Sequence, residues 1–373
     1  RATIISGAPT ASRDMLVSTP DRHLVFFGTE TTIGDPTTQD DMFIRFSNQE
    51  DINTYTPTAV NTAGTQRLAD GSKIVGAVRG RDAMYVWTDT SLFTMRFIGP
   101  PFTFGFQQIG TNCGLIGQNA AIEVDGAAYW FSENGFFKYS GNLETMICLV
   151  EDFVYNDLNT TANQLINAGL NNLFGEITWF YCSSGSTIVD RCVTYNYMES
   201  TPQRPIWTTG TLNRTTWQDS SVFGKPHGTD YDASGTSYDV VGNTEGSTTY
   251  YEHETGTDQV TTTATTAITA NIESGDFDIS QGGDGEFFAK IRRFIPDFLS
   301  QTGDTQITLQ LRNYSNDSQS GSPLGPFTIT SSTSKVDTRA RARAISLKVA
   351  NTAAQQNWKL GGFRLDIQPD GRR

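Results

Sequence analysis

The chain has 373 residues, with 35 glycines, 11% aromatic residues and only 18% charged residues. This length accommodates one large domain and a smaller one, and the composition favours many short strands joined by tight turns. The sequence contains no run of about 18 apolar residues, which excludes a membrane-spanning helix.

The formal net charge of −13 is unevenly distributed along the chain. Residues 1–288 hold 14 Lys and Arg against 34 Asp and Glu, or about −20, whereas residues 289–373 hold 13 against 6, or about +7. This asymmetry predicts a basic surface that faces a polyanion or an acidic neighbour. The alternative interpretation is that the acidic body of the chain pairs with its own basic tail.

The first predicted strands are Leu24–Phe27 and Met42–Phe46, on either side of a loop rich in Thr, Gly and Asp. Ser72–Val78 alternates weakly between polar and apolar residues and leads into a hairpin within Ala83–Gly99. These short strands with polar turns are typical of an all-β domain.

A repeat then defines the predicted fold. Residues 127–141 read AAYWFSENGFFKYSG: an aromatic pair, a Ser-Glu-Asn-Gly turn, a second aromatic strand and a terminal Gly. Asn-Gly between two aromatic runs predicts a tight hairpin, because both residues tolerate positive φ. Residues 83–99 repeat the phrase, and Tyr85 and Tyr129 lie 44 residues apart, which fits the ~40–50 residue period of a propeller blade.

The segments that follow are consistent with further blades. Pro100 and Pro101 exclude a helix between the two hairpins. Glu151–Ala162 is the one segment expected to contain helical turns, and Gly175–Cys182 with Arg191–Tyr197 predicts another hairpin. We expect five to seven blade-like modules within residues 1–266.

From Ala267 the predicted strands are longer and occur at sandwich-like intervals. The sequence therefore predicts an all-β protein, with a β-propeller in residues 1–266 and an antiparallel β-sandwich-like domain in residues 267–373. The strands expected in the second domain are Ile268–Ile272, Phe287–Ile295, Gln306–Arg312, Phe327–Thr330, Ile345–Val349 and Phe363–Ile367.

The residues suited to catalysis form no recognised motif. His23, His227 and His253 are assigned to different modules, and no G-x-S-x-G, P-loop or HExxH occurs. We therefore expect that the protein is not an enzyme and has no catalytic residue and no cofactor. The alternative is a pair of carboxylates that hydrolyses glycosides. The four cysteines are expected to be reduced and buried, and the alternative is a cross-strand disulfide between Cys182 and Cys192.

One weak metal candidate is present. Asp230, Asp232 and Ser234 have the spacing of the first half of a calcium loop. The bidentate Glu that such a loop needs is missing downstream, so a plain turn over Asp230–Gly235 is the competing interpretation.

The most unusual feature is a row of arginines, which we call the arginine comb. Arg339, Arg341 and Arg343, within Asp337–Lys348, share one face of a predicted strand, and the same parity continues in apolar residues from Ile345. Such a change means that the strand passes from a rim into the core or that a bulge shifts its register. The comb either faces DNA phosphates or an acidic neighbouring subunit, or is a solvated strand end.

Several strings of the sequence resemble the tail nozzle or hub proteins, also called DNA-stabilisation proteins, of short-tailed bacteriophages. The strings are Phe97–Gly114, Ala127–Gly141, Glu273–Ile279, Asp337–Arg343 and Phe363–Arg373. The resemblance implies a propeller-bearing structural subunit of the virion, in a hexameric ring that closes the DNA exit channel. It implies as partners the portal and adaptor, a tail spike, fibre or needle, and genomic double-stranded DNA, with assembly in the host bacterial cytoplasm and no membrane insertion. It also implies that residues preceding Arg1 form a further platform.

The alternative function is a carbohydrate-binding or glycoside-hydrolysing propeller, such as a tail-associated adhesin or depolymerase. The positions of Trp179, Trp207 and Trp217 distinguish the two. Burial between blades favours a scaffold, whereas clustering with two carboxylates in the central funnel favours a sugar enzyme.

Overall fold

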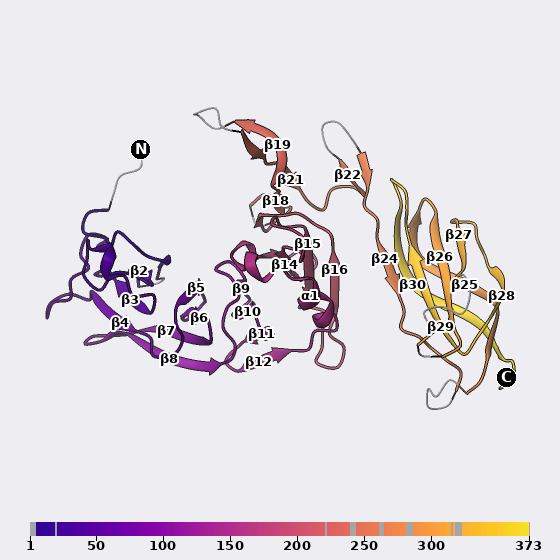
Figure 1. The fold of residues 1–373 in the computed structure, drawn as a ribbon, viewed down its shortest axis with the longest axis horizontal. Coiled ribbons are helices and arrows are strands. Elements are labelled where there is room, and N and C mark those ends of the chain that lie inside the picture. The colour runs from indigo at the N-terminus through magenta and orange to yellow at the C-terminus, as the bar shows by residue number, and fades with distance from the viewer. Residues whose placement is uncertain are drawn as a thin grey trace. The chain divides into compact units, whose positions relative to one another are not determined.

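A computed structural model of the chain describes residues 5–18, 21–220, 222–238, 244–260, 265–280, 286–314, 316–317 and 323–372. The chain is all-β and forms two compact units, residues 1–254 and 255–373 (Figure 1). The sequence placed the domain boundary slightly later, at residues 266 and 267. Residues 255–266, which the sequence prediction assigned to the propeller, belong to the second unit in the structure.

The first unit begins with four antiparallel sheets of four strands, each built from strands that are consecutive in the chain. This up-and-down order is the architecture of propeller blades, so the predicted fold class is confirmed. The first two sheets contain β1 (Asp14–Val17), β2 (Leu24–Phe27), β3 (Phe43–Phe46) and β4 (Gly64–Arg67), then β5 (Ile74–Arg79), β6 (Met84–Thr88), β7 (Ser91–Gly99) and β8 (Thr103–Thr111). The third and fourth contain β9 (Ala121–Val124), β10 (Ala127–Ser132), β11 (Gly135–Tyr139) and β12 (Leu143–Met146), then β13 (Asn167–Asn171), β14 (Glu176–Tyr181), β15 (Arg191–Asn196) and β16 (Trp207–Gly210).

A fifth sheet of three strands completes the described part of the first unit. Its strands are β17 (Thr216–Gln218), β18 (His227–Thr229) and β21 (Tyr250–Glu252), and a separate hairpin of β19 (Asp232–Tyr238) and β20 (Thr244–Ser247) is inserted before the last. The expected turn over Asp230–Gly235 is therefore wrong, because the chain is already a strand from Asp232.

Among the described residues, helical structure is limited to three short segments: η1 (Pro36–Thr38), α1 (Glu151–Asp157) and η2 (Thr160–Leu165). The helical turns expected over Glu151–Ala162 are thus split in two. In the part of the chain that the structure describes, no helix has both the length and the apolar character needed to cross a bilayer.

The sheets pack in series through their first strands. β1 contacts β5, β5 contacts β9, β9 contacts β13, and β13 contacts β17, as the inner strands of propeller blades do. Among the described residues no contact of similar extent joins β17 to β1, and the sheets follow an open arc (Figure 1). The described residues thus supply five blade-like sheets.

The repeated hairpin lies where the sequence predicted it, on β10 and β11, with the equivalent β6 and β7 in the preceding sheet. Its two-residue loop consists of Glu133 and Asn134, because Ser132 pairs with Gly135. Of the Asn-Gly pair only Gly135 has a positive φ, of 126°. The positive φ expected at Gly135 is therefore confirmed.

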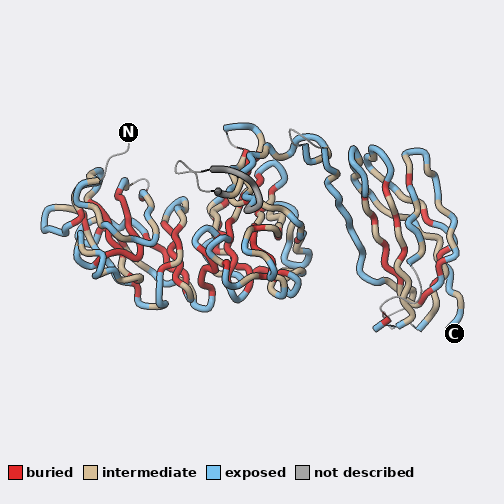
Figure 2. Tube along the Cα trace, turned by 45° about the horizontal axis from the view of Figure 1, so that its top comes forward, coloured by how far each residue is buried: buried red, intermediate tan, exposed pale blue. Residues whose placement is uncertain are grey.

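The second unit is a sandwich of two sheets with a common core, and a small hairpin precedes it. Figure 2 shows the buried residues as stretches along its strands. The sheets have the orders β24-β29-β26-β27 and β28-β25-β30, so strands far apart in the sequence lie side by side. The strands are β22 (Asp258–Val260), β23 (Thr265–Ala267), β24 (Asn271–Glu273), β25 (Ala289–Thr302), β26 (Thr305–Arg312), β27 (Leu324–Ile329), β28 (Val336–Ala342), β29 (Ala344–Ala350) and β30 (Asn357–Pro369).

The change of parity after the arginine comb has a simple structural cause. β28 ends at Ala342 and β29 begins at Ala344 in the opposite sheet. Ala340 and Ile345 therefore both reach the shared core, although their positions differ in parity. Neither a strand that passes from rim to core nor a bulge is the explanation, because the chain changes sheets at Arg343.

Candidate functional site

The candidate site is the outward face of the sheet β28-β25-β30, which we call the basic face. Strand register places Lys290 of β25 opposite Arg341 of β28, and Arg293 opposite Asp337. Residues directly opposite each other in a sheet point to the same side. The register places five cations on this face, and the exposed Arg292 lies beside them in the β-bulge between Ile291 and Arg293. The five are Lys290, Arg293, Arg339, Arg341 and Arg364.

Two members of the arginine comb are anchored within the second unit. Arg341 donates from Nε to Oδ2 of Asp370 at 2.6 Å, and its guanidinium lies 3.9 Å from the ring centre of Phe288. Arg343 lies 4.7 Å from the same ring and donates to the carbonyl oxygens of Glu286 and Arg372 at 2.9 and 3.0 Å. These contacts fasten the C-terminal segment to the sheet, so both side chains have a structural role.

The remaining arginines of the basic face differ in whether they have an ion-pair partner. Arg293, on the middle strand, forms two ion pairs: its Nε lies 3.8 Å from Oδ1 of Asp337 and 3.5 Å from Oδ2 of Asp366. Arg339 on β28 and Arg364 on β30 are exposed, and within the described residues neither has an ion-pair partner. These two guanidinium groups are therefore available to an external anion.

The division into units reduces the charge asymmetry that the sequence suggested. Residues 1–254 hold 14 Lys and Arg against 28 Asp and Glu, or −14, and residues 255–373 hold 13 against 12, or +1. Acidic residues at the start of the second unit pair within it: Asp276 with Arg312 at 2.6 Å and Glu286 with Arg372 at 2.9 Å. The basic character is thus local to one face.

Of the six cations in this region, the sequence prediction named Arg339 and Arg341 and missed the other four. Lys290, Arg292 and Arg293 occur as three cations in four residues on one predicted strand, a signal that was available. Their position beside the arginine comb could not be predicted, because 33 residues lie between the end of β25 and the start of β28, and only the fold pairs the two strands.

The weak metal candidate is engaged in strand contacts. Asp230 accepts hydrogen bonds from the Thr249 N–H at 2.8 Å and from the Tyr251 hydroxyl at 2.9 Å. Asp232 begins β19, whereas the side chain of Ser234 lies outside the described part. Among the described residues no group of three or more His, Cys, Asp and Glu side chains has the geometry of a metal site.

The histidines are placed differently from the sequence interpretation. His227 lies on β18 and His253 directly follows β21, so both belong to the fifth sheet region and not to separate modules. Arg214, which is 6% exposed, donates from Nε to Nε2 of His253 at 2.8 Å. Burial, the neighbouring guanidinium and His227 lower the pKa of His253 to about 4. His23 is buried against Phe104 in the first unit, and burial lowers its pKa as well.

The tryptophans that distinguish a scaffold from a sugar site serve the packing of the sheets. Trp179 is fully buried and donates from its indole nitrogen to the carbonyl oxygen of Ala120, just before the preceding sheet, at 2.9 Å. Trp207 donates to Ile147 at 2.8 Å. Equivalent bonds from Trp217 to Leu170 and from Trp130 to Cys113 measure 2.8 Å each. Each indole thus ties its own sheet to the preceding sheet or to a segment directly before or after that sheet.

A cavity of about 740 Å³ lies among the loops of the first four sheets. Its lining includes two carboxylates, Asp89 and Glu133, and two cations, Arg13 and Lys73, but no tryptophan. Asp89 accepts from the N–H of Ser72 at 2.8 Å, and hydrogen bonding to backbone and side chain lowers its pKa despite the opposing effect of burial.

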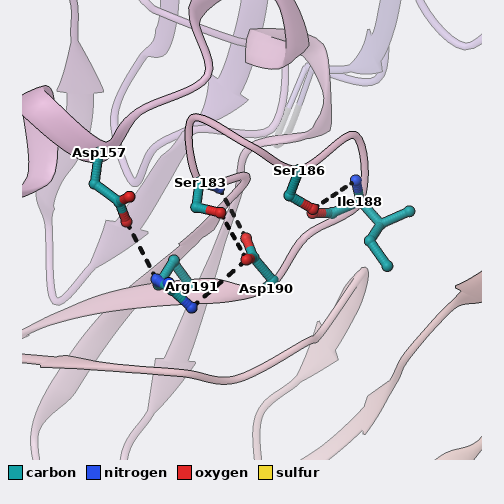
Figure 3. Close-up of polar contacts among 6 residues, drawn as sticks. All are labelled: Asp157, Ser183, Ser186, Ile188, Asp190 and Arg191. Atoms are coloured by element: carbon teal, nitrogen blue, oxygen red, sulfur yellow. Dashed lines mark hydrogen bonds and ion pairs between the residues drawn. The ribbon is translucent and has the colours of Figure 1, made fainter.

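The four cysteines are free thiols; three are buried as expected, but Cys148 is only partly buried. Cys192 stands opposite Phe180, so Cys182 and Cys192 are not paired residues of the β14–β15 ladder. Burial raises the pKa of both thiols to about 11. Beside them Arg191 lies between two carboxylates, at 3.1 Å from Asp157 and 3.5 Å from Asp190, and holds α1 to the hairpin (Figure 3).

Comparison with solved structures finds distant likenesses. No protein-family model matches the chain, and no curated protein matches it. A chain in the structure of S. cerevisiae Dbp5 bound to Nup159, Gle1, IP6 and ADP is 7% identical, with a TM-score of 0.31 over 94% of this chain and 90% of that chain. A glycoside hydrolase is 11% identical, with a TM-score of 0.26 over 97% of this chain and 98% of that chain. At TM-scores this low, neither likeness bears on function.

Proposed function

We propose that this chain is a structural subunit of a bacteriophage virion, a tail nozzle or hub protein that assembles into a hexameric ring below the portal and adaptor. The ring closes the DNA exit channel and anchors the tail tip, spike or fibre. Its partners are further copies of the same chain, the proteins above and below it, and genomic double-stranded DNA, and assembly takes place in the host bacterial cytoplasm.

The observation that carries this proposal is the use of the tryptophans. A sugar-binding propeller needs exposed aromatic rings on which sugars stack. A propeller that hydrolyses glycosides also needs two carboxylates in its funnel. Here Trp179 and Trp207 are buried and Trp217 is half-buried, and their indole N–H groups bond to backbone oxygens in or beside the preceding sheets. This arrangement supports a rigid scaffold, in line with the resemblance to tail nozzle proteins.

The basic face adds support for contact with a polyanion or an acidic surface. Six cations lie on three neighbouring strands, where the spacing along a strand is about 6.6 Å for every second residue. A row of this kind suits phosphate groups or carboxylates presented in sequence.

A carbohydrate-binding function is the second candidate, and the cavity with Asp89 and Glu133 favours it. Binding of bacterial surface glycans to the purified chain, lost on Asp89→Asn or Glu133→Gln, would support this candidate against the nozzle. Equal failure of the wild type and both variants to bind glycans would remove it.

The nozzle proposal is tested on phage particles whose genome encodes the chain. Particles made without the chain are expected to package DNA and then release it, and complementation with wild-type chain restores retention. Cryo-electron microscopy of complete particles is expected to show the chain as a ring below the portal. Absence of the chain from purified virions would contradict the proposal.

A further inference from the structure

The sheet β28-β25-β30 is open at both margins. Within the described residues β28 pairs with β25 only, and β30 pairs with β25 only. β30 spans 13 residues and β28 spans seven. Backbone groups along such margins lack a strand partner, and a long open edge readily pairs with another chain.

The other sheet of the sandwich is protected at its margins. Its edge strand β24 has three residues. Its other edge strand, β27, contains Pro326, which has no N–H group to offer a new strand. The same unit thus blocks pairing at one sheet and permits it at the other, which points to the open sheet as the place where a further strand is added.

The core beneath β30 is incompletely covered. Ile291 and Phe294 on the middle strand β25 are fully buried. By contrast, the core-facing apolar residues of β30 are only partly buried, although they pack against the same cluster. A strand beside β30 would remove more of this apolar surface from water. The partly covered residues are Trp358, Leu360, Phe363, Leu365 and Ile367.

The outward charges of the two open strands are complementary when the strands run in the same direction. β28 presents Asp337, then Arg339 two residues later. β30 presents Arg364, then Asp366 two residues later. Parallel alignment therefore sets Asp337 against Arg364 and Arg339 against Asp366. An antiparallel alignment with Asp337 opposite Asp366 would set Arg339 against Arg364, and like charges directly opposite destabilise a sheet.

We propose that β28 of a second copy of this chain pairs with β30 in parallel, so that the sheet continues from one copy to the next. β28 and β30 are both antiparallel to β25 and so run in the same direction. A head-to-tail ring that presents the basic face on the same side in every copy repeats that strand direction. Arg339 and Arg364, which have no ion-pair partner in the described chain, then meet Asp366 and Asp337 of neighbouring copies. This inference rests on the proposed ring and specifies its interface.

Charge reversal tests the interface in the full-length chain. Arg339→Asp and, separately, Arg364→Asp each place two carboxylates opposite each other, and each is expected to raise the dissociation concentration of the oligomer at least about tenfold. The double variant Arg339→Asp with Asp366→Arg exchanges the two charges and is expected to restore assembly to within about threefold of wild type. Lys359→Asp is the matched control, because this exposed cation lies on β30 beyond the stretch that β28 can cover.

Analytical ultracentrifugation and native mass spectrometry measure the result at low and at physiological salt. Loss in the single variants with recovery in the double variant supports the interface. Wild-type assembly in both single variants, no recovery in the double variant, or a wild-type chain that stays monomeric would each overturn it. Circular dichroism confirms that each variant is folded. Rings that persist in the single variants would overturn this interface alone, whereas absence of the chain from virions would overturn the nozzle function.

Discussion

The two units of the chain are built from strands in opposite ways. In the first unit every four-stranded sheet consists of consecutive strands, so each sheet is a product of one local stretch of sequence. In the second unit β25 pairs with β28 and β30, and β29 pairs with β24 and β26, across long intervals of sequence. The first unit therefore depends on contacts between sheets for its cohesion, whereas the second depends on long-range pairing within sheets. Variants that act on one type of contact should leave the other unit unaffected.

The largest expected effect is on the contact between sheets in the first unit. Trp130 is fully buried and donates to the Cys113 carbonyl at 2.8 Å. Trp130→Ala leaves a cavity and an unpaired acceptor, and should lower the free energy of unfolding of the first unit by about 3–5 kcal/mol. Differential scanning calorimetry should show the transition of the second unit unchanged.

The control for this variant is Phe153→Ala, which truncates an aromatic side chain that is 56% exposed in the same unit. Its effect should stay below about 1 kcal/mol. A Trp130→Ala protein as stable as the Phe153→Ala protein would show that the sheets are held together by other contacts.

Mild acid should act on the first unit through its histidines. All three histidines of the sequence, His23, His227 and His253, lie in that unit. The pKa of His253 is lowered to about 4 in the fold from an ordinary value of 6.5, so its contribution to stability is complete above pH 6.5 and is lost as the pH falls toward 4. Protonated His253 cannot accept the hydrogen bond from Arg214.

Chemical denaturation at pH 7.5 and at pH 5 measures this effect. The first unit should lose stability between the two, and His23, whose pKa is also lowered, adds to the loss in the same direction. His253→Gln keeps an acceptor for Arg214 but does not titrate, so it should flatten the pH dependence. An unchanged pH dependence in this variant would show that His253 does not control the acid response.

A smaller effect is expected at the hairpin turn of the third sheet. Gly135 has a φ of 126°, and a Cβ there would meet nothing closer than 3.8 Å, so the cost of substitution comes from the backbone and not from crowding. Gly135→Val should cost about 1–3 kcal/mol. Asn134→Gly should lower the free energy of unfolding by only about a few tenths of a kcal/mol, because Asn134 has no positive φ to maintain. Equal melting temperatures for the two variants would contradict this turn geometry.

The smallest effects on stability concern the arginine comb in the second unit. Arg339→Gln should change the free energy of unfolding by no more than about 0.5 kcal/mol, because the side chain is exposed. Arg341→Gln should cost about 1 kcal/mol, since it removes the bonds to Asp370 and the contact with Phe288. Urea denaturation compares the two, and an equal cost would show that the anchoring contacts of Arg341 contribute nothing.

The triple variant Arg339→Gln, Arg341→Gln and Arg343→Gln tests function in the same region. It should fold, and it should weaken ring assembly or DNA retention most at low salt, where charges are least screened. DNA release from mutant particles, followed with a fluorescent dye, measures retention. Particles that assemble and hold their genome as wild type does would reduce the arginine comb to a structural anchor.

The sequence by itself determined the local elements: the hairpin of β10 and β11, its copy on β6 and β7, and the all-β class. These follow from alternation and turn chemistry within about 20 residues, which is the range over which sequence pattern acts directly. Only the tertiary structure decided that β28 and β29 belong to different sheets, that Lys290 lies beside Arg341, and that Arg341 and Arg343 hold Phe288 and the C-terminal segment. Strand alternation states which residues share a face, but the neighbour of that face is chosen by packing of the whole core.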